Sequence, residues 1–278
     1  MTYKDILVVV DDRPASQARA VAAATLAARH GAALTGVFLT SDFMNLIFVD
    51  GAGGYAPALD IDRLVSEHAE AVHSAAEAAR MMFEVAAGDA AVRSDWLTIS
   101  GDANAELFSV CRRFDLTIIS PHIRACLGTN RISAATLAMA SGAPVLLLPE
   151  AAGQPTLGRR IVVAWKSTRE SARALHDAWP MLTQAEDVHA VVVSPHGEYG
   201  PDGALQRHLE RHGIAAQVVV DLSRDTDVGE VLRREALSLR ADMMVMGVFG
   251  RTRLGELLLG GVSDTLLRDP PCALFLSH

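Results

Sequence analysis

The chain has 278 residues, of which 50% are hydrophobic, and a formal net charge of −8. This length suits one large or two modest domains with buried cores, and the acidic balance argues against nucleic acid as the main partner. Three cysteines without metal-ligand spacing argue against a disulfide framework, and no apolar run reaches membrane-spanning length. With no secretory signal pattern at the N-terminus, we expect a soluble cytoplasmic protein that makes no contact with membranes.

Short apolar runs alternate with alanine-rich helical segments in the first half of the chain. An insertion at Ser41–Asp62 interrupts the series; a lid, a contact for another subunit and a mobile surface loop are all consistent with it. The predicted elements, in chain order, are strand Ile6–Val10, helix Ala15–His30, strands Leu34–Leu39 and Val92–Ile99, helix Asn104–Arg113, and strands Asp115–Ile119 and Pro144–Leu148.

The second half of the chain repeats this series. Ile161 follows Ile6 by 155 residues, and the linker Glu150–Gly158 joins two predicted domains, 1–149 and 159–278. The predicted elements are strand Ile161–Trp165, helix Ser171–Leu182, strand Val188–Val193, helix Gly203–His212, strand Ala216–Leu222, helix Val228–Arg240, strand Asp242–Met246, helix Val262–Leu267 and strand Ala273–Leu276.

This alternation predicts an α/β fold, with two tandem doubly wound parallel five-stranded sheets that carry helices on both faces. Ligands of such sheets bind beyond the carboxyl ends of the strands, where the strand order reverses. We therefore expect a site beside the first and fourth strands of each domain.

Glycines gather near the C-terminus between a strand and a helix. Gly247 and Gly250 follow the strand, whereas Gly260 and Gly261 precede the helix. Glycine lets a ligand approach main-chain N–H groups, and a helix N-terminus favours phosphate. Arg251 adds a cationic side chain inside the loop. These glycines also suit tight turns alone, but their combination favours a phosphate site.

The spacing G-x2-G-x9-G, followed by a small residue and Val262, resembles the nucleotide-binding signature of the universal stress protein family. The resemblance covers nearly the whole chain. It implies a tandem, two-domain member with Rossmann-like sheets, in which the final strands of the two domains pair. It also implies a homo-oligomer that binds ATP, ADP or AMP in the second domain, with or without Mg²⁺.

The family resemblance also implies roles for individual residues. Val193 would meet adenine through its backbone, and Val262 would lie over the phosphates or the ribose. The family has Ser or Thr where this chain has Gly261, and Ser263 is a candidate to supply the missing hydroxyl.

The two predicted sites differ from each other. The first domain keeps Asp11 after its first strand, where the family has an Asp that helps to fix adenosine. It has lost the glycines, however, and a Cβ at these positions obstructs a phosphate on the backbone. We therefore predict a degenerate first site. The residues that replace Gly247, Gly250 and Gly260 are Ser120, Ile123 and Arg131.

The second domain has Lys166 where the first has Asp11. Two interpretations stay open. Lys166 adds positive charge beside a polyphosphate, or it is a solvated loop lysine at a site that has lost adenine recognition.

The sequence predicts neither catalytic residues nor a metal site. His208 and His212 lie four residues apart on a charged helix, and His122 lies near Cys126 without an orienting third group. The first hypothesis is a stress-response regulator that binds an adenine nucleotide with at most slow hydrolysis. A nucleotide-independent dimeric scaffold, and an enzyme of the wider adenine-nucleotide-binding α/β group, are the alternatives.

Overall fold

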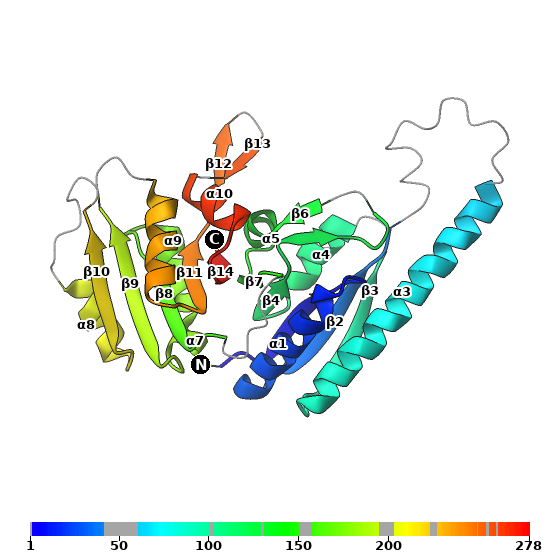
Figure 1. The fold of residues 1–278 in the computed structure, drawn as a ribbon, viewed down its shortest axis with the longest axis horizontal. Coiled ribbons are helices and arrows are strands. Elements are labelled where there is room, and N and C mark those ends of the chain that lie inside the picture. The colour runs from blue at the N-terminus through cyan, green and yellow to red at the C-terminus, as the bar shows by residue number, and fades with distance from the viewer. Residues whose placement is uncertain are drawn as a thin grey trace. The chain divides into compact units, whose positions relative to one another are not determined.

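A computed structural model of the chain describes residues 2–41, 61–100, 103–128, 131–150, 157–194, 203–222, 227–248, 250–253, 256–259 and 261–278. The chain divides into two compact units, whose elements are drawn in Figure 1. We call Tyr3–Ser133 the N-terminal unit, and Ala134–His278, with the first two residues, the C-terminal unit.

The C-terminal unit is built on five parallel strands in the order β10-β9-β8-β11-β14. Their runs of Val, Ile and Met suit strands with both faces covered, and all five residues of β11 are buried. The strands are β8 (Arg160–Ala164), β9 (Asp187–Val193), β10 (Ala216–Asp221), β11 (Met243–Gly247) and β14 (Ala273–Ser277).

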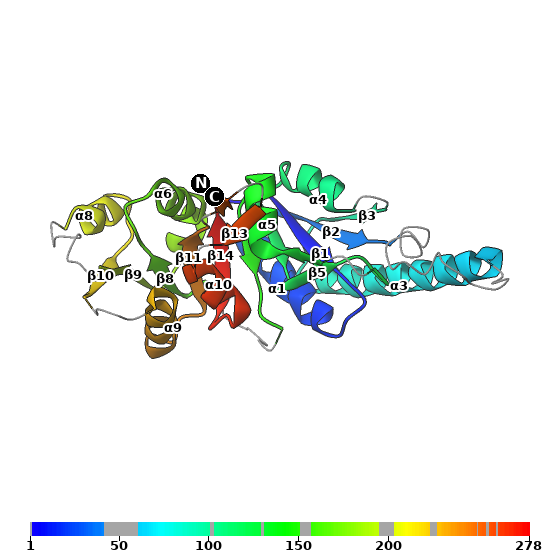
Figure 2. The same ribbon diagram turned by 90° about the horizontal axis from the view of Figure 1, so that it is seen from above.

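Helices cover both faces of this sheet. Figure 2 shows α6 and α8 on one face and α9 and α10 on the other. The chain runs outward from β8 through β9 to β10 and then returns to β11 on the other side of β8. Because the crossovers between parallel strands are right-handed, the helices before and after this return lie on opposite faces of the sheet. The helices are α6 (Arg169–Asp177), α7 (Trp179–Leu182), α8 (Ala204–Arg211), α9 (Val228–Ser238) and α10 (Gly261–Arg268).

The N-terminal unit has the same design, with parallel strands in the order β4-β1-β2-β3. The predicted doubly wound α/β class is confirmed. The elements are β1 (Asp5–Val10), α1 (Ala15–His30), β2 (Ala33–Leu39), α3 (Ile61–Asp89), β3 (Ser94–Ile99), α4 (Ala103–Cys111) and β4 (Leu116–Ile119).

The final strand of the first half pairs with the final strand of the chain, as expected. This strand, β7 (Val145–Leu147), follows α5 (Ala134–Ser141) and runs antiparallel to β14, with Leu146 opposite Phe275. Residues 134–149, which the sequence analysis gave to the first domain, are grouped with the C-terminal unit. The domain boundary drawn from the sequence stays a prediction.

The sequence analysis did not predict α3, a helix of 29 residues. Its buried positions, which include Ala79, Phe83 and Ala86, recur three or four residues apart, as expected for a helix that packs one face on a core. Residues 42–60 of the predicted insertion lie outside the described residues, and its last two residues begin α3.

Two further segments differ from the expectation. The helix predicted over Ser171–Leu182 is two helices, α6 and α7, because Pro180 lacks the N–H that would continue the first one. The glycine-rich segment before α10 contains an antiparallel pair, β12 (Gly250–Arg253) and β13 (Glu256–Leu259). Its counterpart in the N-terminal unit is β5 (His122–Arg124) with β6 (Arg131–Ser133).

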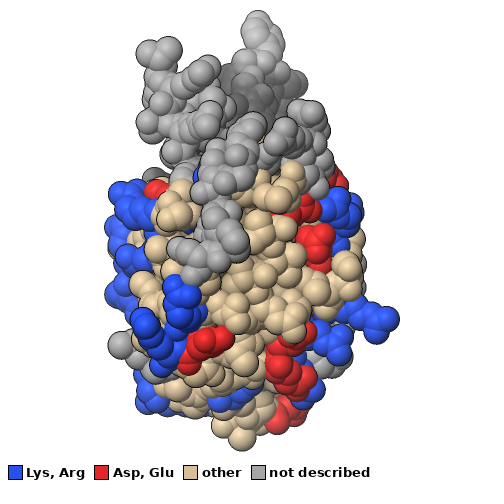
Figure 3. Space-filling view, turned by 90° about the vertical axis from the view of Figure 1, so that its left-hand side faces the viewer, with Lys and Arg blue, Asp and Glu red and all other residues tan. Residues whose placement is uncertain are grey.

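No helix in the described part of the chain is long and apolar enough to cross a membrane. On the face shown in Figure 3, basic and acidic side chains both surround an uncharged central area. That face does not have the single-sign basic surface typical of nucleic-acid-binding proteins. The expectation that nucleic acid is not the partner stays a prediction.

Helices α1 and α3 are followed by a residue in the left-handed conformation, Gly31 (φ 62°) and Ala91 (φ 53°) respectively. A Cβ disfavours this conformation by about 1 kcal/mol. We predict that Ala91→Gly stabilises the N-terminal unit by about 1 kcal/mol and that Gly31→Ala destabilises it by a similar amount. Urea unfolding of the two variants measures both changes, and shifts of the same sign would contradict the argument.

His30, at the end of α1, is 4% exposed, and its ring centroid lies 5.0 Å from that of Tyr3. Burial, and then the charge of Arg29, lower the pKa of His30 from 6.5 to about 4. The unfolded chain therefore binds this proton more tightly than the folded chain. The stability linked to His30 is complete above pH 6.5 and falls as the pH drops toward about 4.

We predict that this linkage removes about 2 kcal/mol of stability between about pH 8 and about pH 5. His30→Phe keeps a ring at this position and removes the titration. Urea unfolding at the two pH values should therefore show a smaller pH dependence in the variant than in the unmodified chain. The same pH dependence in both would rule out His30 as its source.

Candidate functional site

A cavity of about 290 Å³ lies at the carboxyl ends of β8, β9 and β11 in the C-terminal unit. Parallel α/β sheets bind ligands at this position, where the strand order reverses. Strand ends and the first turns of helices line it. The lining residues are Ala164, Trp165, Lys166, Ser171, Val191, Val193, Val228, Leu232, Met246, Gly247, Gly261, Val262 and Ser263.

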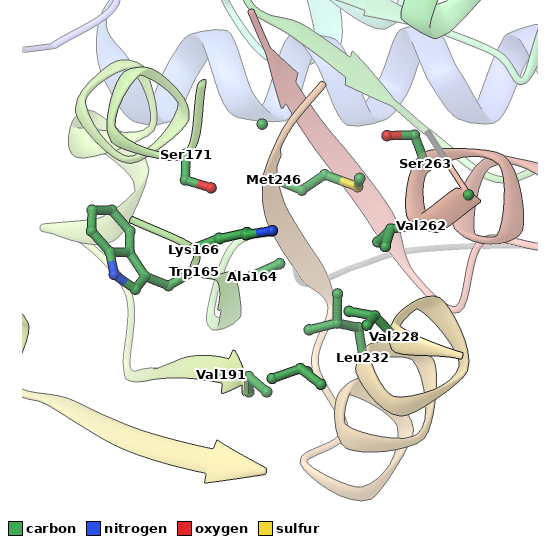
Figure 4. Close-up of a pocket in the computed structure, with 13 residues that line it drawn as sticks. Ala164, Trp165, Lys166, Ser171, Val191, Val228, Leu232, Met246, Val262 and Ser263 are labelled. Atoms are coloured by element: carbon green, nitrogen blue, oxygen red, sulfur yellow. The ribbon is translucent and has the colours of Figure 1, made fainter. Parts of the chain in front are cut away.

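The cavity has an apolar end and a polar end. In Figure 4, Val191 of β9 lies with Val228 and Leu232 of α9, whereas Ser171 of α6 and Ser263 of α10 lie on the opposite side of the view. Small-molecule sites commonly combine an apolar wall with a few polar groups that fix the orientation of the ligand.

Lys166 follows β8 and lies between these two ends. Its side chain extends across the middle of the cavity in Figure 4, with the ammonium group toward Met246. Lys166 is the one ionisable side chain among the described residues that line the cavity. It makes the cavity favourable for an anion.

One wall of the cavity is an open strand edge. Pairing of β8 with β9 ends at Ala164 opposite Val191, after which the Trp165 N–H donates to the Val191 C=O over 2.9 Å. Strand β9 continues to Val193, and Ser194 then bonds to β10. Because alternate residues of a parallel strand bond to the same neighbour, Val193 directs its N–H and C=O toward the β8 side. No backbone partner for these two groups lies on that side among the described residues.

Helices α6, α9 and α10 begin beside the cavity. Each N-terminus carries a partial positive charge. Side-chain oxygens of Thr168 and Asp227 cap α6 and α9, whereas the first three residues of α10, from Gly261, line the cavity directly. Together with Lys166, this turn of α10 is suited to hold a phosphate or another anion.

The predicted site residues that the structure brings together at this cavity are Lys166, Val193, Gly247, Gly261, Val262 and Ser263. Gly250 and Arg251 belong to β12, whose side chains are not described, and Gly260 lies outside the described residues. A role in nucleotide binding stays a prediction for all of them.

Sequence reasoning missed much of the apolar wall and the serine on α6. Val191, Val228 and Leu232 read as ordinary core positions in their elements. Ser171 carried a usable signal, because it follows Ser16 by the same 155 residues that separate Ile6 and Ile161.

Gly247 and Gly261 lack side chains for different reasons. A Cβ on Gly247 would lie 2.5 Å from the backbone carbon of Glu170 and 2.7 Å from the nitrogen of Ser171, at the start of α6. A Cβ on Gly261 would meet nothing within 4 Å. Gly247 therefore lets α6 pack closely on β11, and Gly261 leaves open space beside the first turn of α10.

In the N-terminal unit, side chains of the unit itself fill the equivalent position. Asp11, which follows β1, is 7% exposed and forms ion pairs with Arg13 at 2.7 Å and Arg19 at 2.9 Å. Burial acts to raise the pKa of Asp11, but the hydrogen bond from Arg13 and the two guanidinium charges lower it below its usual value. Arg13 also donates to the Ser120 Oγ at 2.8 Å and the His122 C=O at 2.9 Å.

The edge of β2 is closed as well. Leu39, at the end of β2, accepts a hydrogen bond of 2.7 Å from the Cys126 N–H, and the Ser41 Oγ donates to the Cys126 C=O at 2.5 Å. The segment after β4 thus covers the strand end that corresponds to the open edge at Val193. Burial and the charge of Asp12 raise the pKa of the Cys126 thiol to about 11, which keeps it protonated and unreactive at neutral pH.

His208 of α8 and His212, which caps the C-terminus of this helix, form part of a cluster of rings. The ring centroids of His208 and His212 are 4.9 Å apart, and both rings lie near Trp179. Among the described residues, no group of three His, Cys, Asp or Glu side chains is arranged to hold a metal ion.

Comparison with protein-family models gives a match to the model described as the universal stress protein family, at residues 158–278. Residues 158–278 match this family's model, and we call them the universal stress protein domain. This domain contains all the residues that line the cavity. A comparison with curated protein sequences gives no significant match.

Solved structures of universal stress proteins resemble the whole chain. One from Archaeoglobus fulgidus DSM 4304 is 15% identical over 98% of this chain and 97% of its own, with a TM-score of 0.69. A candidate universal stress protein from Pseudomonas aeruginosa UCBPP-PA14 is 16% identical over 99% and 93%, with a TM-score of 0.59. These similarities establish the fold. A universal stress protein in complex with cAMP is 18% identical over 43% and 74%, and its TM-score of 0.25 supports no conclusion about this chain.

We predict that Gly247→Ala destabilises the universal stress protein domain by about 1–3 kcal/mol, because the new Cβ overlaps the backbone at the start of α6. The matched control is Gly261→Ala, on the same cavity, which should change the stability by less than about 0.5 kcal/mol. Thermal and urea unfolding of both variants measure the difference. Equal effects at the two glycines would contradict the packing role of Gly247.

Proposed function

We propose that the universal stress protein domain binds an adenine nucleotide, ATP, ADP or AMP, in the cavity between Val193 and the first turn of α10. The observation that carries this proposal is the order of chemical groups across the cavity. An open strand edge is followed by an apolar slot, then by Lys166, and then by a helix N-terminus. This order matches the base, the sugar and the phosphates of a nucleotide.

The base would lie at the edge of β9. Adenine carries a donor amino group beside an acceptor ring nitrogen, and Val193 offers a C=O beside an N–H on the same side of the strand. Val191, Val228 and Leu232 supply apolar surface for the faces of the ring. Backbone recognition needs no particular side chain, so it is compatible with Lys166 in place of the Asp that the family resemblance leads one to expect.

The phosphates would lie toward α10. The N–H groups of its first turn, the hydroxyl of Ser263 and the ammonium group of Lys166 all favour negative charge. All of these groups favour the binding of an anion. We therefore propose that the domain binds the nucleotide and hydrolyses it slowly at most.

We infer that the bound nucleotide controls the conformation or the assembly of the protein. The filled position around Asp11 supports one nucleotide per chain, because Arg13 and Arg19 already occupy the space beside that carboxylate. A stress-response role and a homo-oligomeric state in the cytoplasm belong to the same proposal.

Titration of the full chain with ATP, ADP and AMP tests the proposal. At a ligand concentration of 100 times the dissociation constant, binding stabilises the protein by about 2.7 kcal/mol, which appears as a rise in Tm. Acid denaturation of the purified protein should also release a bound adenine nucleotide. If none of the three nucleotides raises the Tm at millimolar concentration and none is released, the nucleotide-independent scaffold is favoured instead.

A pair of variants at Val193 locates the base. Val193→Pro removes the N–H that faces the cavity without breaking a described ladder bond, because β8 ends before this residue. Val193→Ala keeps that N–H. We expect the Pro variant to bind ATP about tenfold more weakly than the Ala variant, at a similar Tm without ligand, by isothermal titration calorimetry. Equal affinities would place the base elsewhere.

A further inference from the structure

The two units carry opposite charges at equivalent positions. Asp11 follows the first strand of the N-terminal unit, and Lys166 follows the first strand of the C-terminal unit, 155 residues later. The same offset places Thr168 at the position of Arg13 and Ala174 at the position of Arg19. A charged cluster in one unit is therefore replaced by a single cation and two small side chains in the other.

In the N-terminal unit the carboxylate of Asp11 is paired within the unit. The carboxylate of Asp11 lies within 2.9 Å of both guanidinium groups, and Arg19 is 4% exposed. The anion and both of its cationic partners therefore come from the protein itself.

In the C-terminal unit no ion pair of Lys166 is present among the described residues. At the starts of α6 and α9, Glu170 pairs with Arg169 at 3.2 Å and Asp227 caps α9. The ammonium group extends into the cavity (Figure 4). The positive charge of Lys166 therefore faces the cavity and not a carboxylate of its own unit.

The strand order determines which part of a nucleotide this charge meets. Lys166 leaves β8, which lies between β9, with its open edge at Val193, and β11, which ends at Gly247. Neighbouring strands are about 4.8 Å apart. A base at β9 would thus have its first phosphate near Lys166, and the later phosphates would lie beyond β11, toward α10.

We propose that Lys166 binds the α-phosphate and so makes the cavity select phosphorylated nucleotides over neutral nucleosides. This inference rests on the proposed nucleotide binding. In the N-terminal unit, Asp11 supplies the anion that pairs with Arg13 and Arg19. In the C-terminal unit, the ligand would supply the anion that pairs with Lys166. One phosphate is enough to satisfy the cation, so AMP meets the requirement as well as ATP does.

Affinities of adenosine, AMP and ATP for the full chain and for Lys166→Met test this inference. Methionine keeps the apolar stem and removes the charge. We expect Lys166→Met to weaken the binding of AMP and of ATP by the same factor, about tenfold or more. The affinity for adenosine should not change. Lys166→Arg should retain most of the affinity for AMP, and the Tm of each variant without ligand serves as the control for folding.

Each other outcome overturns the inference in a recognisable way. An equal loss of affinity for adenosine and for AMP in Lys166→Met would mean that Lys166 packs on the base or the sugar. A loss that appears with ATP and not with AMP would place Lys166 at the terminal phosphates, and no loss at all would make it a solvated lysine. If the unmodified chain binds none of the three ligands, the proposed function itself fails, which is distinct from binding without dependence on charge.

Discussion

The parallel register of β8 between β9 and β11 is the constraint on which the candidate site depends. Because the three strands run the same way, their carboxyl ends meet at one edge of the sheet, and helices begin around that edge. Strand β8 stops opposite Val191, so β9 keeps an open edge at Val193. The missing Cβ of Gly247 then lets α6 pack against β11. Backbone geometry therefore sets the position and the width of the cavity.

The N-terminal unit shows how few side chains decide whether such a cavity stays open. It has the same strand order around β1, yet Arg13 reaches from the end of β1 to Ser120 and His122, and Cys126 covers the end of β2. A long guanidinium side chain fills volume and satisfies a carboxylate at the same time. The small residues at the equivalent positions of the C-terminal unit do neither, and the space remains.

The strands were predictable because buried parallel strands are nearly continuous apolar runs, such as Met243–Met246 of β11. The helix α3 was missed because its N-terminal residues fall in a segment that reads as an insertion and because alanine forms much of its packed face. The break between α6 and α7 carried a local signal in Pro180 that the helical pattern on both sides of it obscured.

The sequence alone determined the internal repeat, the α/β class, and the exchange of Asp11 for Lys166, because all three depend on residue type and spacing along the chain. It also indicated six residues that meet at the cavity, since the ends of parallel strands converge whatever their side chains. Only the tertiary structure decided that Arg13 and Cys126 fill the first position, that Gly247 makes room for α6, and that Val228 and Leu232 of α9 face β9. Those contacts join residues far apart in the chain, and they depend on how helices pack on the sheet, which no local pattern encodes.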